Sequence, residues 1–425
     1  MAVLVIDGPC RLHGAINVHG AKNSTLPLLA ACLLCRGQVV LHNCPRLSDV
    51  ETASQILRQL GCVVQRQDDA LVVDPRGVCG YSIPEALMRE MRSSIVFLGA
   101  LLARMGQARL SFPGGCELGP RPIDLHLRAL RRLGVKIYED HGELVCQLGR
   151  RITGTNLSLS FPSVGATENI ILASCCGKGT TVLHGAAQEP EIEDLCRFLN
   201  ACGAKIVGAG KSTLQIEGVD SLSGCDYTVM PDRIEAATFL CAAAGTGGEI
   251  TVQRVVPRHL QPVLSLLEEA GCTLREEKTA VSLKAPPRLQ AVHAVRTLPY
   301  PGFPTDAQAP MLSMLCTAEG TSMVTETIFL NRFKYVGELL RLGARVKVED
   351  RVAVVEGVPK LSGAPVVAPD LRGGAALLIA GLCAEGETVV GGVEHIDRGY
   401  EKAEESFRQL GAPVCRLPGG VEKER

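Results

Sequence analysis

A pattern that recurs six times constrains the fold of this 425-residue chain more than any other feature of its sequence. Each copy has a helix ending in leucine or a small residue, then a glycine, then a strand with alternating apolar positions. The glycines, spaced 73, 69, 68, 72 and 68 residues apart, are Gly61, Gly134, Gly203, Gly271, Gly343 and Gly411. Glycine is favoured just past a helix end because it adopts the left-handed conformation without strain. The regular spacing predicts six copies of one structural unit.

Each copy also carries a second helix that is apolar almost all round, and such a helix has to be buried on every side. We expect these helices near residues 26–34, 95–103, 170–176, 236–244, 309–316 and 375–383. Short apolar strands follow the first four, at residues 38–42, 108–112, 180–184 and 249–253. Three buried helices covered by sheets and amphipathic helices make one domain, so six copies predict a two-domain α/β protein.

The first amphipathic helix is expected to begin at Ser48. Apolar residues recur at helical spacing from Val50 to Leu60, and Ser48 with Glu51 matches the capping-box pattern. We therefore expect Ser48 to cap this helix through its side chain.

Composition and charge exclude several classes of function. A net charge of −1 argues against a nucleic acid or an anionic membrane as partner, because both need a basic excess. No apolar run approaches the roughly 18 residues that span a bilayer, and the first residues lack signal-peptide features, so we expect a cytoplasmic protein. The 18 cysteines are then expected to be reduced. We interpret the pair Cys32 and Cys35 as core residues, because no second pair or histidine lies at zinc spacing.

Polar and charged residues cluster where the six buried helices begin. They are Lys22 and Asn23, Arg92 and Ser93, Ser163 and Thr167, Asp232 and Arg233, Thr305 and Asp306, and Asp370 and Arg372. Taken singly, each is explained by an ordinary helix cap. Cations, however, are unfavourable at a helix N-terminus, which carries partial positive charge itself. Their recurrence predicts a site for an anionic small molecule.

The loop from Pro113 to His126 is the strongest candidate for chemistry. It contains three glycines and three prolines, so it cannot continue a helix or a strand. Cys116, Arg121, Asp124 and His126 lie on this loop or at its exit. A turn with one surplus cysteine and a hydrolase that uses Cys116 with His126 both remain possible at this point.

Eight motifs, in this order along nearly the whole chain, resemble one family. They are Gly20–Asn23, the loop with Cys116 and Arg121–His126, Ser163–Thr167, Pro231–Arg233, Phe303–Asp306, Asn331–Phe333, Asp370–Arg372 and His395–Tyr400. The family is UDP-N-acetylglucosamine 1-carboxyvinyltransferase. The resemblance implies a two-domain inside-out α/β barrel with three repeats per domain and the active site in the interdomain cleft. It implies domains at residues 22–230 and at residues 1–21 plus 231–425, with hinges at the two crossings.

The resemblance also implies a reaction and its residues. The enolpyruvyl group of phosphoenolpyruvate passes to the 3-hydroxyl of UDP-N-acetylglucosamine and phosphate is released, the first committed step of peptidoglycan synthesis; no metal or organic cofactor is implied. Phosphoenolpyruvate is then bound by Lys22, Asn23, Arg92, Arg121, Arg332, Arg372 and Arg398. The UDP-sugar is bound by Arg92, Arg121, Pro122, Ile123, Asp124, Leu125, His126, Ser163, Val164, Gly165, Asp306 and Ile328.

The implied catalytic residues are Cys116, Asp306, Lys22, Asn23 and Arg398. Asp306 takes the proton of the sugar hydroxyl, and Cys116 is the residue attacked by fosfomycin. One position departs from the family pattern, since Leu330 stands where many members have an acidic residue. A weakly active paralogue that binds the UDP-sugar for regulation therefore stays an alternative. So does an enzyme with a different acceptor, such as shikimate 3-phosphate, although the Arg121–His126 match argues against it.

Overall fold

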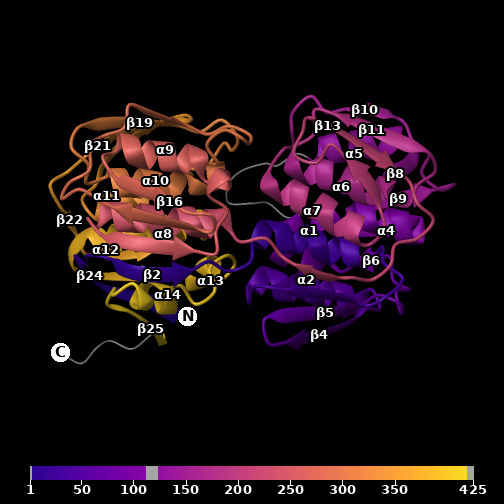
Figure 1. The fold of residues 1–425 in the computed structure, drawn as a ribbon, viewed down its shortest axis with the longest axis horizontal. Helices are drawn as coiled ribbons and strands as arrows, with labels where there is room; N and C mark the ends of the chain where they lie inside the picture. Colours follow the sequence, from indigo (N-terminus) through magenta and orange to yellow (C-terminus); the bar gives the residue numbers. More distant parts are fainter. Residues whose placement is uncertain (1, 112–122, 419–425) are drawn as a thin grey trace. The chain divides into compact units, whose positions relative to one another are not determined.

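A computed structural model describes residues 2–111 and 123–418 (Figure 1). The chain divides into two compact units. Unit 1 contains residues 2–19 and 231–418, and unit 2 contains residues 20–111 and 123–230. Among the described residues, no helix is long and apolar enough to cross a membrane.

Unit 2 is built from three similar segments, which follow one another along the chain. The first has α1 (Lys22–Cys32), β3 (Val39–His42), α2 (Ser48–Gln59), β4 (Val63–Gln67) and β5 (Ala70–Asp74). The second has β6 (Ser82–Ile83), α3 (Glu85–Glu90), the 3-10 helix η1 (Arg92–Val96), α4 (Phe97–Met105), β7 (Gln107–Ser111), α5 (Asp124–Arg132), β8 (Val135–Asp140) and β9 (Glu143–Leu148). The third has β10 (Asn156–Ser158), α6 (Val164–Ser174), β11 (Thr180–His184), α7 (Pro190–Ala201), β12 (Lys205–Val207), β13 (Thr213–Glu217) and β14 (Asp226–Thr228).

Unit 1 repeats the same plan and also takes in the N-terminal strands β1 (Ala2–Gly8) and β2 (His13–Asn17). Its first segment has α8 (Arg233–Gly245), β15 (Glu249–Gln253), η2 (Pro257–His259), α9 (Gln261–Glu269), β16 (Thr273–Glu276) and β17 (Ala280–Lys284). The second has β18 (Ala294–Arg296), η3 (Thr305–Ala307), α10 (Gln308–Leu315), β19 (Thr321–Thr325), α11 (Val336–Arg341), β20 (Arg345–Glu349) and β21 (Val352–Glu356). The third has β22 (Leu361–Ser362), β23 (Pro365–Val367), α12 (Leu371–Cys383), β24 (Ala384–Gly391), α13 (Val393–Ile396), α14 (Ala403–Gln409) and β25 (Val414–Pro418).

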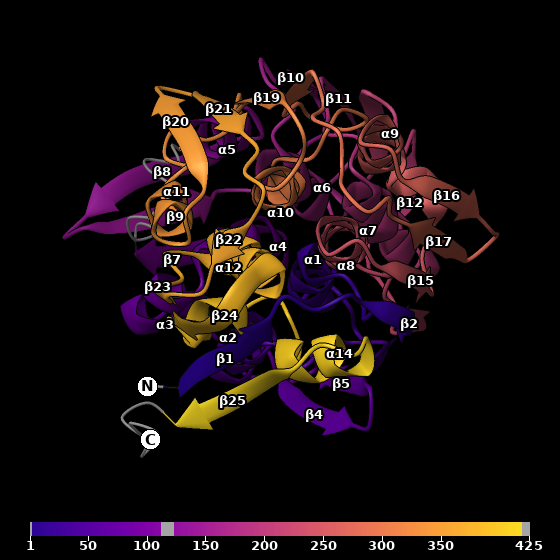
Figure 2. The ribbon, with the colours of Figure 1, turned by 90° about the vertical axis from the view of Figure 1, so that its left-hand side faces the viewer.

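The described residues form six mixed sheets, one for each segment. Their strand orders are β14-β3-β5-β4, β6-β7-β9-β8, β10-β11-β13-β12, β16-β17-β15-β2, β18-β19-β21-β20 and β22-β24-β1-β25, with β23 also paired to β24. In the third sheet β10 pairs with β11 in parallel, and β11 and β12 are both antiparallel to β13. In the sixth, β1 lies between β24 and β25 and is antiparallel to both (Figure 2).

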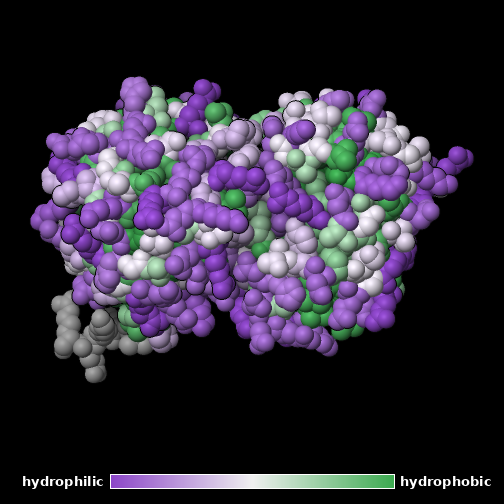
Figure 3. Space-filling view, in the orientation of Figure 1, coloured by the Kyte–Doolittle hydropathy of each residue, from purple (hydrophilic) through white to green (hydrophobic). Residues whose placement is uncertain are grey.

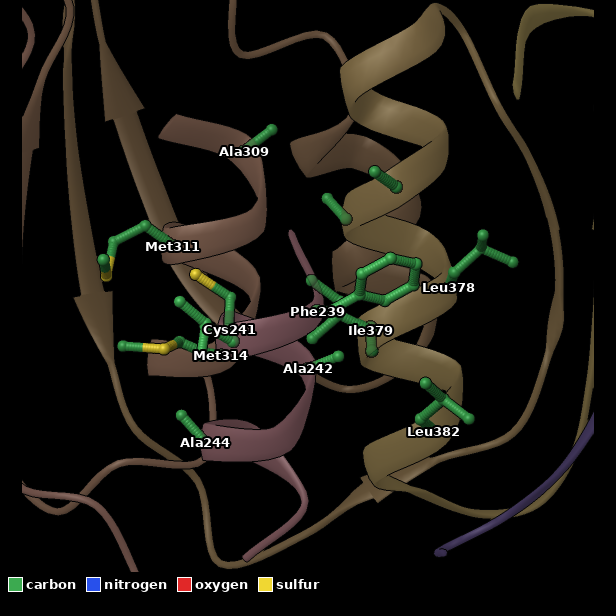
Figure 4. Packing of buried hydrophobic residues seen from close by; sticks show 14 of the residues in the cluster. Phe239, Cys241, Ala242, Ala244, Ala309, Met311, Met314, Leu378, Ile379 and Leu382 are labelled. Atoms are coloured by element: carbon green, nitrogen blue, oxygen red, sulfur yellow. The ribbon is translucent and has the colours of Figure 1, made fainter. Parts of the chain in front are cut away.

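The expected all-apolar helices form the two cores. In unit 1, α10 packs against α8 and α12, and Figure 4 shows Phe239 of α8, Met314 of α10 and Ile379 of α12 among the buried side chains. In unit 2, α4 packs against α6 and α1. On the face shown in Figure 3, hydrophobic residues are scattered among hydrophilic ones. The prediction of six buried helices is therefore confirmed.

The six glycines of the repeat all have positive φ angles, of +101°, +90°, +102°, +96°, +87° and +86° in chain order. This confirms the prediction that each lies just past a helix end in the left-handed region. Gly61 has a second constraint, because a Cβ there would lie 2.4 Å from the carbonyl oxygen of Gly77.

The capping box predicted at Ser48 is wrong. The helix does begin at Ser48, but Ser48 is its first residue and not its cap, because the N-cap position is occupied by the buried Leu47 and no side chain caps the helix. The carbonyl of Leu47 accepts from the N–H groups of Val50 and Glu51, both at 3.1 Å. Glu51 instead forms an exposed ion pair with Arg58 at 2.8 Å. Burial of Leu47 determines where this helix starts. The capping-box motif matches only residue types at positions i and i+3, so it carries no information about burial.

Cys32 and Cys35 are completely buried, which confirms that they are core residues. Over residues 2–111 and 123–418, the His, Cys, Asp and Glu side chains form no group that could hold a metal ion.

The chain passes between the units at residues 19–20 and 230–231, and hydrogen bonds fix the backbone on each side of these crossings. In unit 2, the N–H of Ala21 donates to the carbonyl of Met230 at 2.7 Å. In unit 1, the N–H of Asp232 donates to the carbonyl of His19 at 2.9 Å. The ring of His19 also pairs with the buried Glu235 at 2.8 Å, and this contact raises the pKa of His19 to about 9.

Candidate active site

Asp306 lies between two buried arginines in unit 1. Its Oδ1 is 2.8 Å from Nη2 of Arg332, and its Oδ2 is 2.9 Å from Nη2 of Arg372. The side chains of Arg332 and Arg372 are 3 % and 5 % exposed, whereas that of Asp306 is 25 % exposed. Each carboxylate oxygen thus accepts from a different guanidinium group, and the carboxylate remains reachable from solvent.

Other groups hold the two arginines in place. Arg332 also donates to the carbonyl of Thr305 at 3.0 Å and lies over the ring of Phe329. Arg372 donates to the hydroxyl of Tyr400 at 3.2 Å. Burial is the largest single influence on the pKa of Arg372 and would lower it, but Asp306, Tyr400 and Asp232 together outweigh burial and raise the pKa above its usual value. Arg372 is therefore fixed as a cation.

Helix geometry explains why these side chains meet. Thr305 and Asp306 form the short helix η3, which leads directly into α10. Asp370 caps α12 by accepting from the N–H groups of Arg372 and Gly373, at 2.9 and 3.0 Å. Asp232 and Ser163 cap their helices in the same way. These three residues are thus ordinary helix caps, which is the explanation that the sequence suggests for each residue taken singly. Arg372 is not explained in this way, because it places a cation in the first turn of α12.

Glu326 is a buried carboxylate that the sequence did not single out. Its Oε1 accepts from the hydroxyl of Thr297 at 3.0 Å and from the N–H groups of Ile328 and Phe329 at 2.7 and 3.0 Å. Its Oε2 accepts from the hydroxyl of Thr305 at 2.9 Å. Glu326 therefore ties the residue before Asp306 to the segment that carries Ile328 and, farther on, Arg332.

The remaining unit 1 candidates lie close by along the chain. Ile328 is half-buried, and the unusual Leu330 is exposed. Arg332 takes its orientation from Asp306 and Thr305, so it does not depend on an acidic residue at position 330. Arg398 is half-buried, two residues before the Tyr400 that bonds Arg372.

In unit 2, Lys22 begins α1 and is buried against Asp49 of α2, with Nζ 2.7 Å from Oδ2. Asn23 follows it and is half-buried. Arg92 begins η1, which packs against α1 and α6. The short helix η1 therefore lies beside both α1, which Lys22 begins, and α6.

A second group in unit 2 surrounds His126, a buried residue in the first turn of α5. Its Nδ1 is 3.0 Å from Nδ2 of Asn169, in the middle of α6. The ring lies against Gly165, where a Cβ would come within 2.9 Å of Cε1. Burial lowers the pKa of His126 to about 4, and the nearby Asp124 opposes this only in part. His126 is therefore neutral near pH 7.

Ser163 caps α6 by accepting from the N–H of Ala166, and Val164 and Gly165 form the first residues of that helix. Ile123 and Leu125 are half-buried at the start of α5, and Asp124 is exposed beside them. These residues therefore lie at the starts of two helices that pack together. Cys116, Arg121 and Pro122 lie outside the described residues, as does the side chain of Arg92.

The fold places the protein among the enolpyruvyl transferases, as the sequence predicted. The structure of the enolpyruvyl transferase NikO from Streptomyces tendae is similar with a TM-score of 0.88 and 27% identity, over 98% of this chain and 99% of that one. EPSP synthase from Acinetobacter baumannii shares the fold, with a TM-score of 0.74 and 18% identity over 98% of this chain and 100% of that one. Residues 6–407 match the family described as EPSP synthase (3-phosphoshikimate 1-carboxyvinyltransferase).

Sequence relatives narrow this class. UDP-N-acetylglucosamine 1-carboxyvinyltransferase 2 from Caldanaerobacter subterraneus subsp. tengcongensis is 54% identical over 98% of this chain and 100% of its own length. UDP-N-acetylglucosamine 1-carboxyvinyltransferase 1 from Symbiobacterium thermophilum is 52% identical over 97% of this chain and 95% of its own length. The chain belongs to the UDP-N-acetylglucosamine 1-carboxyvinyltransferase family.

Proposed function

We propose that this protein transfers the enolpyruvyl group of phosphoenolpyruvate to the 3-hydroxyl of UDP-N-acetylglucosamine and releases phosphate, the first committed step of peptidoglycan synthesis. The observation that carries the proposal is Asp306 bonded to two buried arginines, in a chain that matches family members over almost its full length. The site combines a carboxylate base with cations for an anionic substrate.

The arrangement suggests how phosphoenolpyruvate prepares the base. Arg332 and Arg372 are the partners of Asp306, and they are also the cations that the phosphate and carboxylate of the substrate need. The incoming anions compete with Asp306 for these guanidinium groups. Carboxylate oxygens of Asp306 then become available to the sugar hydroxyl.

The hydroxyl oxygen bonds to the central carbon of phosphoenolpyruvate as Asp306 takes its proton, and the terminal carbon gains a proton. This gives a tetrahedral intermediate. Loss of phosphate and of a proton from that terminal carbon then restores the double bond. The cations stabilise charge on the phosphate and carboxylate throughout.

The other roles follow from likeness to the family. Lys22, Arg121 and Arg398 hold phosphoenolpyruvate together with Arg92, and Asn23 positions the reacting centre. The residues from Arg121 to His126, with Ser163, Val164, Gly165 and Ile328, bind the UDP-sugar. Cys116 assists proton transfer or product release and is the site of fosfomycin attack. We expect the reaction to take place in the cytoplasm.

Substrate binding closes the two domains, which comprise residues 22–230 and residues 1–21 with 231–425. The hinges are the crossings near Gly20 and Pro231. Saturating UDP-N-acetylglucosamine should then reduce the radius of gyration in solution scattering and protect the loop around Cys116 from proteolysis. Unchanged scattering and digestion would exclude closure.

The activity is tested by phosphate release from phosphoenolpyruvate with UDP-N-acetylglucosamine, with shikimate 3-phosphate as the alternative acceptor. Phosphate release with UDP-N-acetylglucosamine, and not with shikimate 3-phosphate, supports the proposal. Phosphate release only with shikimate 3-phosphate would show that this molecule, and not the UDP-sugar, is the acceptor. Binding of the UDP-sugar without phosphate release would instead indicate the regulatory paralogue.

A further inference from the structure

The side chain of Asn169 bridges two backbone groups of a neighbouring helix. Asn169 is completely buried in α6. Its Nδ2 donates to the carbonyl of Ile95 at 3.1 Å, and its Oδ1 accepts from the N–H of Gly99 at 2.6 Å. In a regular α-helix, residue 99 would donate directly to residue 95. The amide therefore sits at the junction of η1 with α4.

The close approach depends on glycine. A Cβ on Gly99 would lie 2.3 Å from the backbone oxygen of Asn169 and 2.9 Å from its Oδ1, so no larger residue fits there without a shift. Gly99 and Asn169 thus form a matched pair that joins α4 to α6.

These backbone partners determine which way the amide points. The N–H of Gly99 can only donate and the carbonyl of Ile95 can only accept. The atom that faces Gly99 must then be oxygen, and the atom that faces Ile95 and His126 must be nitrogen. Nδ2 lies 3.0 Å from Nδ1 of His126 and, on the same side, 3.3 Å from the carbonyl of Gly165. A proton on Nδ1 would point at an amide nitrogen that cannot accept it, so Nδ1 is the acceptor and the proton of the neutral ring resides on Nε2.

Nε2 has no hydrogen-bond partner among residues 2–111 and 123–418. The ring itself lies against Gly165, at the N-terminus of α6. The N–H of Nε2 thus remains as a donor beside residues assigned above to the UDP-sugar.

We infer that Asn169 is a positioning residue that fixes His126 in the Nε2–H tautomer, and that this N–H donates to an oxygen of the UDP moiety. The identity of the ligand rests on the function proposed above. The tautomer rests on the structure alone.

Long-range ¹H–¹⁵N NMR of the ¹⁵N-labelled full chain at neutral pH tests the tautomer. The His126 signals are assigned by their absence from the His126→Gln variant. We expect the proton on Nε2 and a bare Nδ1. A proton on Nδ1 of the unsubstituted protein would overturn the inference.

Asn169→Asp tests the link between the two residues. A carboxylate cannot donate to Nδ1 and attracts a proton onto it, so we expect Nδ1 to become protonated. Isothermal titration should then show UDP and UDP-N-acetylglucosamine binding about two- to tenfold more weakly, the effect of one hydrogen bond. A bare Nδ1 in this variant, or unchanged nucleotide binding despite a protonated Nδ1, would contradict the inference.

Asn200→Asp is the matched control. Asn200 of α7 also bridges backbone groups, donating to the carbonyl of Ile206 at 2.8 Å and accepting from its N–H at 2.9 Å. We expect wild-type nucleotide binding and an unchanged His126 spectrum from it. Equal loss in both variants would mean that Asn169 acts only through stability. If the wild-type protein binds UDP but releases no phosphate, the proposed function fails while the role of Asn169 stands.

Discussion

Replacing Asp306 by asparagine should destabilise the unliganded protein and abolish most turnover at once. The variant keeps the shape of the side chain but leaves Arg332 and Arg372 buried without their counter-charge. Each contact contributes about 4 kcal/mol at an effective dielectric constant of about 20. The cost of removing these charges from water offsets part of the attraction in the two contacts. Removing one partner of a buried ion pair therefore lowers the free energy of unfolding by about 3 to 5 kcal/mol in all. We expect the free energy of unfolding to fall by that amount.

Urea denaturation and the phosphate-release assay measure the two effects. Turnover should fall by about a hundredfold or more, the usual contribution of a general base. Inorganic phosphate should stabilise the variant more than the wild type, because it replaces the missing anion beside the two arginines. Glu356→Gln is the control, since it breaks an exposed pair with Arg345 and should cost less than about 1 kcal/mol. Wild-type stability together with turnover within tenfold would refute the reasoning.

Three further predictions concern residues around the site. Gly165→Ala places a Cβ 2.9 Å from Cε1 of His126, so it should displace the ring and weaken UDP-N-acetylglucosamine binding by calorimetry; unchanged affinity would place the UDP-sugar elsewhere. Glu326→Ala removes the acceptor of four hydrogen bonds and should lower both kcat and the free energy of unfolding, the latter by about 1 to 3 kcal/mol; an unaffected kcat would limit Glu326 to stability. Burial lowers the pKa of His126 from 6.5 to about 4, so the unfolded chain binds more protons and stability should fall as the pH drops through that window, by at most about 3 kcal/mol. His126→Gln should weaken this pH dependence in urea titrations, and parallel curves for both proteins would contradict it.

Local rules were enough to predict the repeated architecture. The six glycines reflect a backbone requirement at one residue, and the all-apolar helices reflect burial of a whole segment, so both signals are contained in short stretches of sequence. The capping box at Ser48 failed for the opposite reason. There, burial of the preceding Leu47 against the rest of the unit decided where the helix starts.

The residues of the candidate site also fall into those that the local sequence predicted and those that it missed. Arg372 stands out because a cation is unfavourable at a helix start, whereas Asp306 is a carboxylate favoured there and stands out only through the likeness to the family. Asn169 and Glu326 were missed because their roles depend on partners in other segments, such as Gly99, 70 residues away from Asn169. An asparagine directly before the apolar run of α6 was the available signal, and residue spacing alone does not say what it contacts.

The position of β1 has a consequence for synthesis of the chain. β1 pairs on one side with β24 and on the other with β25, and β2 pairs with β15, so these two early strands have their partners much later in the chain. Residues 20–230 contain all the strand partners of unit 2 and can complete its sheets first. β2 can pair once Glu249–Gln253 has been made, whereas β1 has to wait for Ala384–Gly391 on one edge and for Val414–Pro418 on the other. Truncation within β25 would therefore expose one edge of β1 and favour aggregation of nearly full-length chains.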